Sequence, residues 1–252
     1  MGLVAATCFQ HNPATQPQAF TVLGYLASDE VDDDLIYQIL VAMSTALSHF
    51  VGNDSILIVS MLRCLSRIIP GLFPDSRYVT SLFWLAVGVL QLGYIPLFAP
   101  ALELMITALR SINMANEGMQ STELMEFLLD ARRTVADQVK KLDQVSGVSF
   151  DTDITFALIA IIYKGVRHPS TKKLTAEIFL ELLQLAANTG GSSAGNGTFV
   201  VAGGVAYFVA LLSISANSGD ELKDVFKAAR LYVDDGHMDV ECVSVFSLLS
   251  IP

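Results

Sequence analysis

Positive charge is scarce in this chain. Its 252 residues contain 15 Lys and Arg against 25 Asp and Glu, which gives a net charge of −10 and a pI near 4.7. Nucleic-acid affinity depends on clustered Lys and Arg that release counterions from the phosphate backbone. The basic doublets are Arg132-Arg133, Lys140-Lys141 and Lys172-Lys173, and each lies in a segment that also carries acids. We interpret them as solvated helix faces and expect no nucleic-acid partner.

Cysteine and histidine are also sparse. Cys8, Cys64 and Cys242 are far apart and form no C-x-x-C pair, which is typical of buried thiols in a reducing compartment. The four histidines do not stand at zinc-site spacing, and the chain contains no calcium loop, phosphate loop or nucleophile elbow. We interpret the nearest group of metal-ligating residue types as a solvated turn; it consists of Asp234, Asp235, His237 and Cys242. The sequence predicts no metal, no cofactor and no catalytic residue.

Uninterrupted apolar runs of membrane-spanning length are lacking as well. The uncharged stretches Tyr78 to Leu102 and Asn188 to Gly219 exceed the roughly 20 residues that cross a bilayer. The first is broken by Gln91, Gly93 and two prolines, and the second by a Gly, Ser and Asn run before Phe199. Neither has the flanking Lys and Arg asymmetry of an inserted helix, and no signal-peptide pattern opens the chain. We expect a cytoplasmic protein without direct membrane insertion.

Apolar residues are abundant, at 52% of the chain, and they recur at helical spacing. The clearest pattern runs from Ser121 to Leu142, where one apolar stripe is flanked by charged residues that include Arg132 and Arg133. The stripe consists of Leu124, Leu128, Ala131, Val135, Gln138 and Leu142. We predict one long outer helix here, with its charged side chains in solvent.

Helix start and stop signals divide the chain into about ten helices with almost no strand. Asp32 to Asp34, within the acidic cluster Asp29 to Asp34, supply capping carboxylates. Pro70-Gly71 and Gly93 end helices, and Ser170 or Thr171 caps the start of one. The predicted helices cover about 16–26, 34–50, 54–69, 77–92, 97–112, 121–142, 152–163, 170–187, 199–215 and 220–232, followed by a short terminal segment at 240–249.

The order of these helices predicts the fold class. Strongly apolar helices alternate with amphipathic ones, and a helix pair recurs roughly every 40 residues, which matches the period of HEAT or armadillo-like repeats. We therefore predict an all-α protein, an α-solenoid of such helix pairs in which residues 1–252 form a single helical-repeat segment. A flexible loop is expected at about 188–198. A compact orthogonal bundle is the alternative.

Several short sequence runs occur in a characteristic order. They are Gln16-Pro17-x-Ala19 with Val22 and Gly24; Leu82-Phe83-Trp84-x-Ala86-Val87-x-Val89-Leu90-Gln91-Leu92; Phe156-Ala157-Leu158 followed by Lys164-Gly165-x-Arg167-His168-Pro169-Ser170; and Val205-Ala206-Tyr207 with Ala210-Leu211-Leu212. From about Asn12 to about Ile214, this order resembles a segment of neurofibromin and its fungal relatives, the large Ras GTPase-activating proteins. The similar segment lies in their helical-repeat region, C-terminal to the catalytic and lipid-binding modules.

The resemblance implies a fragment of a larger negative regulator of Ras signalling. Its role would be that of a non-catalytic scaffold whose partners are other proteins or other parts of the same parent chain, and the family's repeats also take part in homodimer assembly. No arginine lies in the family's Phe-Leu-Arg type of finger motif, so we expect no enzyme activity. The resemblance marks structural motif residues at Phe83, Trp84, Gln91, Lys164, Gly165, Arg167, His168 and Pro169.

Three of these residues allow a more specific expectation. Trp84 is expected to be a core anchor rather than a partner contact, because apolar residues crowd the same helix. Lys164 would favour the dipole at a helix C-terminus. Arg167 either ties its loop to a neighbouring helix end or carboxylate, or is an exposed loop charge.

Two other functions remain open from the sequence. A free-standing armadillo-like adaptor would bind an extended peptide in a groove lined with Asn, Trp or charged side chains. An all-helical enzyme would need a cleft with two or more polar residues of perturbed pKa.

Overall fold

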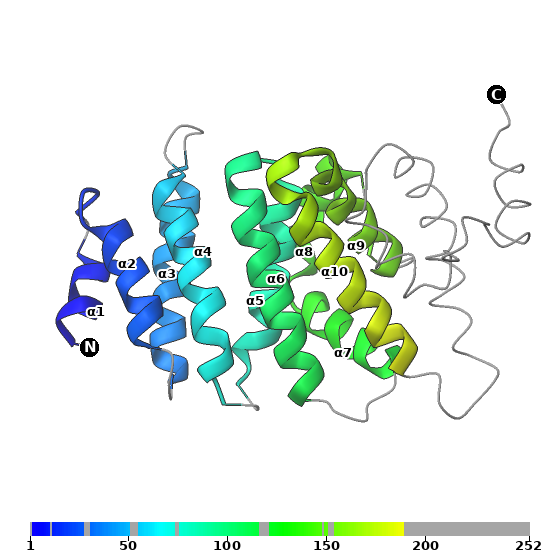
Figure 1. Cartoon of the computed structure of the whole chain (residues 1–252), viewed down its shortest axis with the longest axis horizontal. Helices are drawn as coiled ribbons and strands as arrows, with labels where there is room; N and C mark the ends of the chain where they lie inside the picture. The colour runs from blue at the N-terminus through cyan, green and yellow to red at the C-terminus, as the bar shows by residue number, and fades with distance from the viewer. Residues whose placement is uncertain are drawn as a thin grey trace, which may run out of the picture. The chain divides into compact units, whose positions relative to one another are not determined.

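The computed structural model describes residues 2–10, 12–27, 31–50, 55–73, 76–115, 121–147, 149–150 and 154–188. Within these ranges the elements are helices, apart from an isolated parallel bridge between Val31 and Leu72 (Figure 1). The α-helices are α1 Gly2–Phe9, α2 Gln16–Leu26, α3 Asp33–Ser48, α4 Ile56–Ile68, α5 Tyr78–Gln91, α6 Ile95–Ala115, α7 Ser121–Arg133, α8 Ala136–Ser146, α9 Ile154–Tyr163 and α10 Pro169–Asn188; the 3-10 turns are η1 Ile69–Gly71 and η2 Lys164–Arg167. The all-α prediction is confirmed for the described part of the chain. The expected loop beyond Asn188 and the helices expected after Phe199 lie outside it.

The predicted helix start and stop signals coincide with helix ends in the structure. The Asp32 carboxylate accepts a hydrogen bond of 2.9 Å from the Leu35 backbone N–H and so caps α3, as expected for the acidic cluster. Helix α4 ends at Ile68 and passes into η1, whose second residue, Pro70, has no N–H to donate to the preceding turn. Gly93 ends α5 with a φ of 66°, a left-handed conformation that glycine adopts without a Cβ clash.

Two predicted boundaries are wrong. The expected long helix from Ser121 to Leu142 breaks at Thr134-Val135 into α7 and α8. There the Thr134 hydroxyl donates to the Ala131 carbonyl at 2.7 Å, so a side chain competes with the helical backbone bond. Helix α10 begins at Pro169, so Ser170 and Thr171 lie inside it and neither caps it; proline suits the first helical position, where no N–H partner is needed.

Helix α1 was not predicted. Its segment is apolar on every side and carries no charged residue that would mark a capped start.

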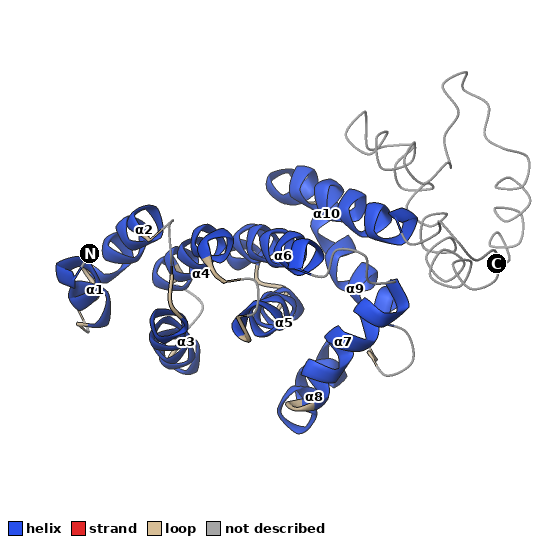
Figure 2. Cartoon of the chain, turned by 90° about the horizontal axis from the view of Figure 1, so that it is seen from below, coloured by secondary structure: helices blue, strands red, loops and turns tan. Residues whose placement is uncertain are grey.

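By its internal contacts the chain divides into two units. The first comprises residues 1–117 and 131–142, and the second comprises 118–130 and 143–252. In the first unit, α1 packs on α2, α3 on α4 and α5 on α6, while α2, α4 and α6 also pack side by side (Figure 2). Helices α1 to α6 of this unit therefore form three pairs in two layers. In the second unit, α10 packs on η2 and α9.

Helices α2 and α4 approach each other closely at Gly24. A Cβ atom built on Gly24 of α2 would lie 3.0 Å from the Cα of Cys64 on α4 and 3.5 Å from the Cδ of Arg67. Real Cβ atoms rarely come this close to a backbone carbon. The missing side chain of Gly24 lets α2 and α4 meet and leaves room for the aliphatic stem of Arg67.

Helix α6 is long and apolar enough to cross a membrane by length and composition alone. Of its most apolar window, 61% is buried against other parts of the protein, as in the core helix of a packed helical domain. It packs against α4 and α5, so its apolar surface already has protein contacts.

The two cysteines of the first unit are expected to be chemically inert. Burial raises the pKa of the Cys8 thiol to about 11. It raises that of Cys64 to about 12, with the neighbouring Cys8 adding to the shift and Arg67 opposing it. Because the thiolate is the nucleophile, near pH 8 the reactive fraction is roughly a thousandth or less, against about a quarter for a free thiol.

In a Cys242→Ser variant, we expect these two thiols to react with Ellman's reagent at least about a hundredfold more slowly in the native protein than in denaturant. The folded state keeps its protons while the unfolded thiols lose theirs, so stability should also fall as the pH rises from about 8.5 towards 11. Rapid native labelling of both thiols would contradict the buried placement.

Candidate functional site

The part of the chain that the structure describes contains no candidate metal-binding site. No group of three or more His, Cys, Asp or Glu side chains gathers there at metal-binding distance. The group formed by Asp234, Asp235, His237 and Cys242 lies outside the described residues. The remaining candidates for a site are the two sequence motifs and the polar surface.

The first motif lies on α5 and is buried. Phe83 is fully buried, Trp84 is 8% exposed and Gln91 is 4% exposed. The Phe83 and Trp84 rings meet edge to face, with centroids 5.2 Å apart and an interplanar angle of 79°. Trp84 is thus a core anchor, as the sequence led us to expect.

Arg132 covers the Trp84 ring, which corrects the prediction that its charge is solvated. Its guanidinium carbon lies 4.7 Å from the ring centroid, and the residue is only 6% exposed. A guanidinium is planar and weakly hydrated, so it stacks on an aromatic face at lower desolvation cost than an ammonium group. Arg133, the second residue of the doublet, is exposed as predicted. It is the last residue of α7, immediately before the helix break at Thr134-Val135.

The second motif forms the turn between α9 and α10. Gly165 is buried, and its carbonyl accepts a 2.6 Å hydrogen bond from the Thr171 hydroxyl. Lys164, the first residue of η2, and Pro169, the first residue of α10, are both exposed. Arg167 ends η2, and its side chain lies outside the described atoms, so both interpretations of it stand. This motif therefore forms the turn that leads into α10.

One pair in this turn has the residue types of a hydrolase. Nδ1 of the exposed His168 lies 2.7 Å from Oγ of Ser170. The two residues are separated by Pro169 alone, and the Ser170 backbone N–H also points to the same nitrogen at 3.4 Å. A nucleophile and base of this kind need a third group that orients the base and donors for an oxyanion. Among the described residues the structure gives His168 no carboxylate, so the pair acts as a local helix-start contact.

The two motifs belong to different units.

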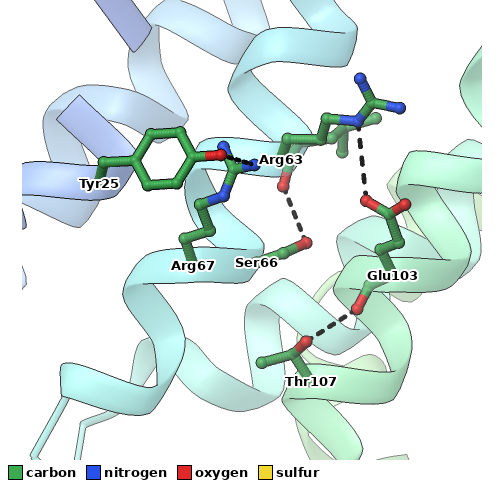
Figure 3. Close-up of polar contacts among 7 residues, drawn as sticks. Tyr25, Arg63, Ser66, Arg67, Glu103 and Thr107 are labelled. Atoms are coloured by element: carbon green, nitrogen blue, oxygen red, sulfur yellow. Dashed lines mark hydrogen bonds and ion pairs between the residues drawn. The ribbon is translucent and has the colours of Figure 1, made fainter. Parts of the chain in front are cut away.

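A polar site that the sequence did not reveal crosses α2, α4 and α6 (Figure 3). The Arg67 guanidinium carbon lies 4.0 Å from the centroid of the Tyr25 ring, and one of its nitrogens donates to the Tyr25 hydroxyl at 3.0 Å. One helical turn earlier, Arg63 forms a 3.7 Å ion pair with Glu103 of α6. The signal in the sequence was the spacing of Arg63 and Arg67 on an otherwise apolar helix, which places both on one face.

Apolar side chains continue this surface on α2. Val22, Tyr25 and Leu26 are 45%, 65% and 53% exposed. Their spacing of three and four residues places them on one face of the helix. We call Val22, Tyr25, Leu26, Arg63 and Arg67 the Tyr–Arg patch.

No family model matches this chain. Among curated proteins it is similar to the inhibitory regulator protein IRA2 of Saccharomyces cerevisiae, with 26% identity over 184 residues, which is 71% of this chain. It is also similar to the inhibitory regulator protein IRA1 of the same yeast, with 24% identity over 169 residues, or 65% of the chain. The chain spans about 6% of the length of each relative. These matches support, at low identity, a relationship to the neurofibromin-like regulators that the sequence resembles.

Proposed function

We propose that this chain is a non-catalytic helical-repeat scaffold segment of a neurofibromin-like Ras GTPase-activating protein. The parent protein would restrain Ras signalling in the cytoplasm, and this segment would support its architecture and its assembly with other proteins or with other parts of the same chain. The observation that carries the proposal is the low-identity match, over about two thirds of the chain or more, to two yeast proteins named as inhibitory regulators.

The packing of the first unit supports a repeat architecture. In a HEAT or armadillo-like solenoid, each helix pair cannot bury its apolar face alone and packs against the next pair. The pairs α1/α2, α3/α4 and α5/α6 follow this rule, because α4 packs between α2 and α6. The proposal includes this solenoid assignment.

The state of Arg132 supports a scaffold rather than a catalyst. An arginine finger must reach the γ-phosphate of GTP bound to its partner. Arg132 is buried on the Trp84 ring, so its guanidinium cannot reach a nucleotide on a partner. The burial of Trp84, which is the sole tryptophan of the chain, also disfavours the peptide-binding adaptor, since that function would place tryptophan in an open groove.

The catalytic part of the proposal is tested by GTP hydrolysis. Adding the purified 252-residue chain to GTP-loaded Ras should leave the rate of phosphate release at its intrinsic value. A Ras-activating module with an arginine finger serves as the positive control and should accelerate hydrolysis on the order of 10⁵-fold. Acceleration by the chain alone would contradict a non-catalytic role.

The scaffold part is tested in the full-length parent. A substitution that disrupts the first unit, such as Gly24→Val, should raise the cellular fraction of GTP-bound Ras while leaving the rate of the isolated catalytic module unchanged. An unchanged Ras-GTP fraction with a demonstrably unfolded segment would remove the link to Ras regulation.

A further inference from the structure

We infer that the Tyr–Arg patch is a docking surface for an acidic amphipathic protein helix. This inference rests on the proposed role as an interaction scaffold and specifies one of its surfaces and the chemistry of its partner.

The layer formed by α2, α4 and α6 is locally basic. Helix α2 carries no charged residue, α4 carries Arg63 and Arg67 without an acid, and α6 carries Arg110 with Glu103 as its one acid. The chain as a whole has a net charge of −10. Acidic residues are therefore abundant elsewhere but scarce on the described part of this layer.

Arg67 is positioned in advance for a carboxylate. Its aliphatic stem passes close to Gly24, its guanidinium lies on the Tyr25 ring, and one N–H group donates to the Tyr25 hydroxyl. A guanidinium has five N–H donors in a fixed fork, so donors remain after this single bond. Within the described residues the structure pairs Arg67 with no carboxylate. Because the Tyr25 contact already holds the Arg67 guanidinium in place, less side-chain entropy is lost when a partner carboxylate binds.

Arg63 adds a second cation at matching spacing. It lies four residues before Arg67, so the two guanidinium groups rise from successive turns of α4. Its ion pair with Glu103 lies on the surface, because the Arg63 side chain is 50% exposed and the Glu103 side chain is 37% exposed. Surface ion pairs of this kind contribute little to stability. A helix with acids four residues apart can therefore engage both arginines, displacing Glu103 from Arg63.

The apolar part of the patch selects a protein helix over other anions. Val22, Tyr25 and Leu26 expose an apolar stripe beside the arginines, and tyrosine and arginine are the residue types that dominate binding energy at protein interfaces. A nucleic acid would need more clustered cations than two arginines provide on a chain of this net charge. An amphipathic helix offers both the carboxylates and the apolar side chains.

The test measures binding of the whole 252-residue chain to a fluorescein-labelled peptide by anisotropy. The peptide is a designed amphipathic helix with a Glu pair at i and i+4 beside a Leu stripe, and its twin has Gln in place of both Glu residues. We expect saturable binding of the Glu peptide, at least about tenfold weaker binding of the Gln twin, and weakening with added salt.

Variants locate the binding on the patch. Arg67→Ala should weaken binding at least about tenfold, whereas Tyr25→Phe, which keeps the ring, should weaken it only a few-fold. The matched control is Arg77→Ala, because Arg77 makes the same kind of contact outside the patch. Its guanidinium carbon lies 4.9 Å from the centroid of the Tyr78 ring, and one of its nitrogens donates to the Tyr78 hydroxyl at 3.0 Å. Equal binding by the Arg67→Ala and Arg77→Ala variants, with both folded by circular dichroism, would overturn the inference.

Two other binding partners of the Tyr–Arg patch would give distinct experimental outcomes. Light scattering that shows a dimer lost on Arg67→Ala would assign the patch to a second copy of the chain and overturn the acidic-helix assignment. Displacement of the peptide by a single-stranded oligonucleotide at lower concentration than by unlabelled peptide would do the same in favour of nucleic acid. Neither result bears on the Ras-GTP measurement, so failure of the patch and failure of the proposed function are distinguishable.

Discussion

Trp84→Ala is expected to destabilise the protein by about 3–5 kcal/mol, the usual cost of removing a large aromatic side chain from a core. Trp84 is 8% exposed and packs edge to face on Phe83, while Arg132 covers its ring. Its loss would leave a cavity and would also strip a buried cation of its aromatic partner. The free energy of unfolding should be measured by urea denaturation followed by far-UV circular dichroism.

An exposed aromatic provides the matched control for this substitution. Tyr37 lies on helix α3 and is 57% exposed, so Tyr37→Ala should change the free energy of unfolding by less than about 1 kcal/mol. A cost for Trp84→Ala no larger than that of Tyr37→Ala would show that Trp84 lies at the surface.

The contact between Trp84 and Arg132 can be isolated by a double-mutant cycle with Trp84→Leu and Arg132→Met, because neither replacement keeps the aromatic ring or the guanidinium. We expect a coupling free energy of about 1–2 kcal/mol, because the guanidinium is desolvated where it meets the ring. Trp84 is the sole tryptophan, so its fluorescence reports on the same contact. Arg132→Met should shift the emission, and the control Arg133→Met, at the exposed neighbour, should leave it unchanged.

Gly24→Val is expected to destabilise the protein by about 3 kcal/mol, at the upper end of overpacking costs. The Cβ would lie 3.0 Å from the Cα of Cys64, which is backbone and cannot rotate away. The two γ-carbons of valine would add to the clash, so α2 and α4 would have to separate. Thermal and urea denaturation give the magnitude.

The control for Gly24 is another glycine in the middle of a helix. At Gly88 of α5 the nearest atom to a built Cβ is the Leu142 Cδ2 at 3.7 Å, an ordinary contact. Gly88→Ala should therefore stabilise the protein by up to about 1 kcal/mol through helix propensity, whereas Gly24→Ala should lose that gain to the clash. If both alanine variants were equally stabilising, the close approach of α2 and α4 would be wrong.

Much of the helical architecture was readable from the chain. The Asp32 cap, the Pro70-Gly71 stop and the Gly93 stop depend on a few neighbouring residues, so their physics is local and the sequence shows it. The same holds for the buried Leu128, whose place in an apolar stripe follows from helical spacing alone. Helix α1 has no such cap or amphipathic pattern, and it was missed for that reason.

The candidate site was less accessible to prediction. The motif residues from Lys164 to Pro169 were recognised, but the sequence could not show that Gly165 offers its carbonyl to Thr171. The Tyr–Arg patch was missed because Tyr25 and Arg67 are 42 positions apart in the chain and meet through tertiary packing. Spacing along one helix cannot report such a contact.

The sequence by itself determined the helical class, most helix ends and the resemblance to a family of Ras regulators, because these depend on residue type and short-range spacing. Tertiary structure alone decided the fate of particular charges. Arg132 and Arg133 are adjacent and chemically identical, yet one is buried on Trp84 and the other is exposed. A guanidinium is stable in either environment, so its place depends on whether the packed helices bring an aromatic face to it.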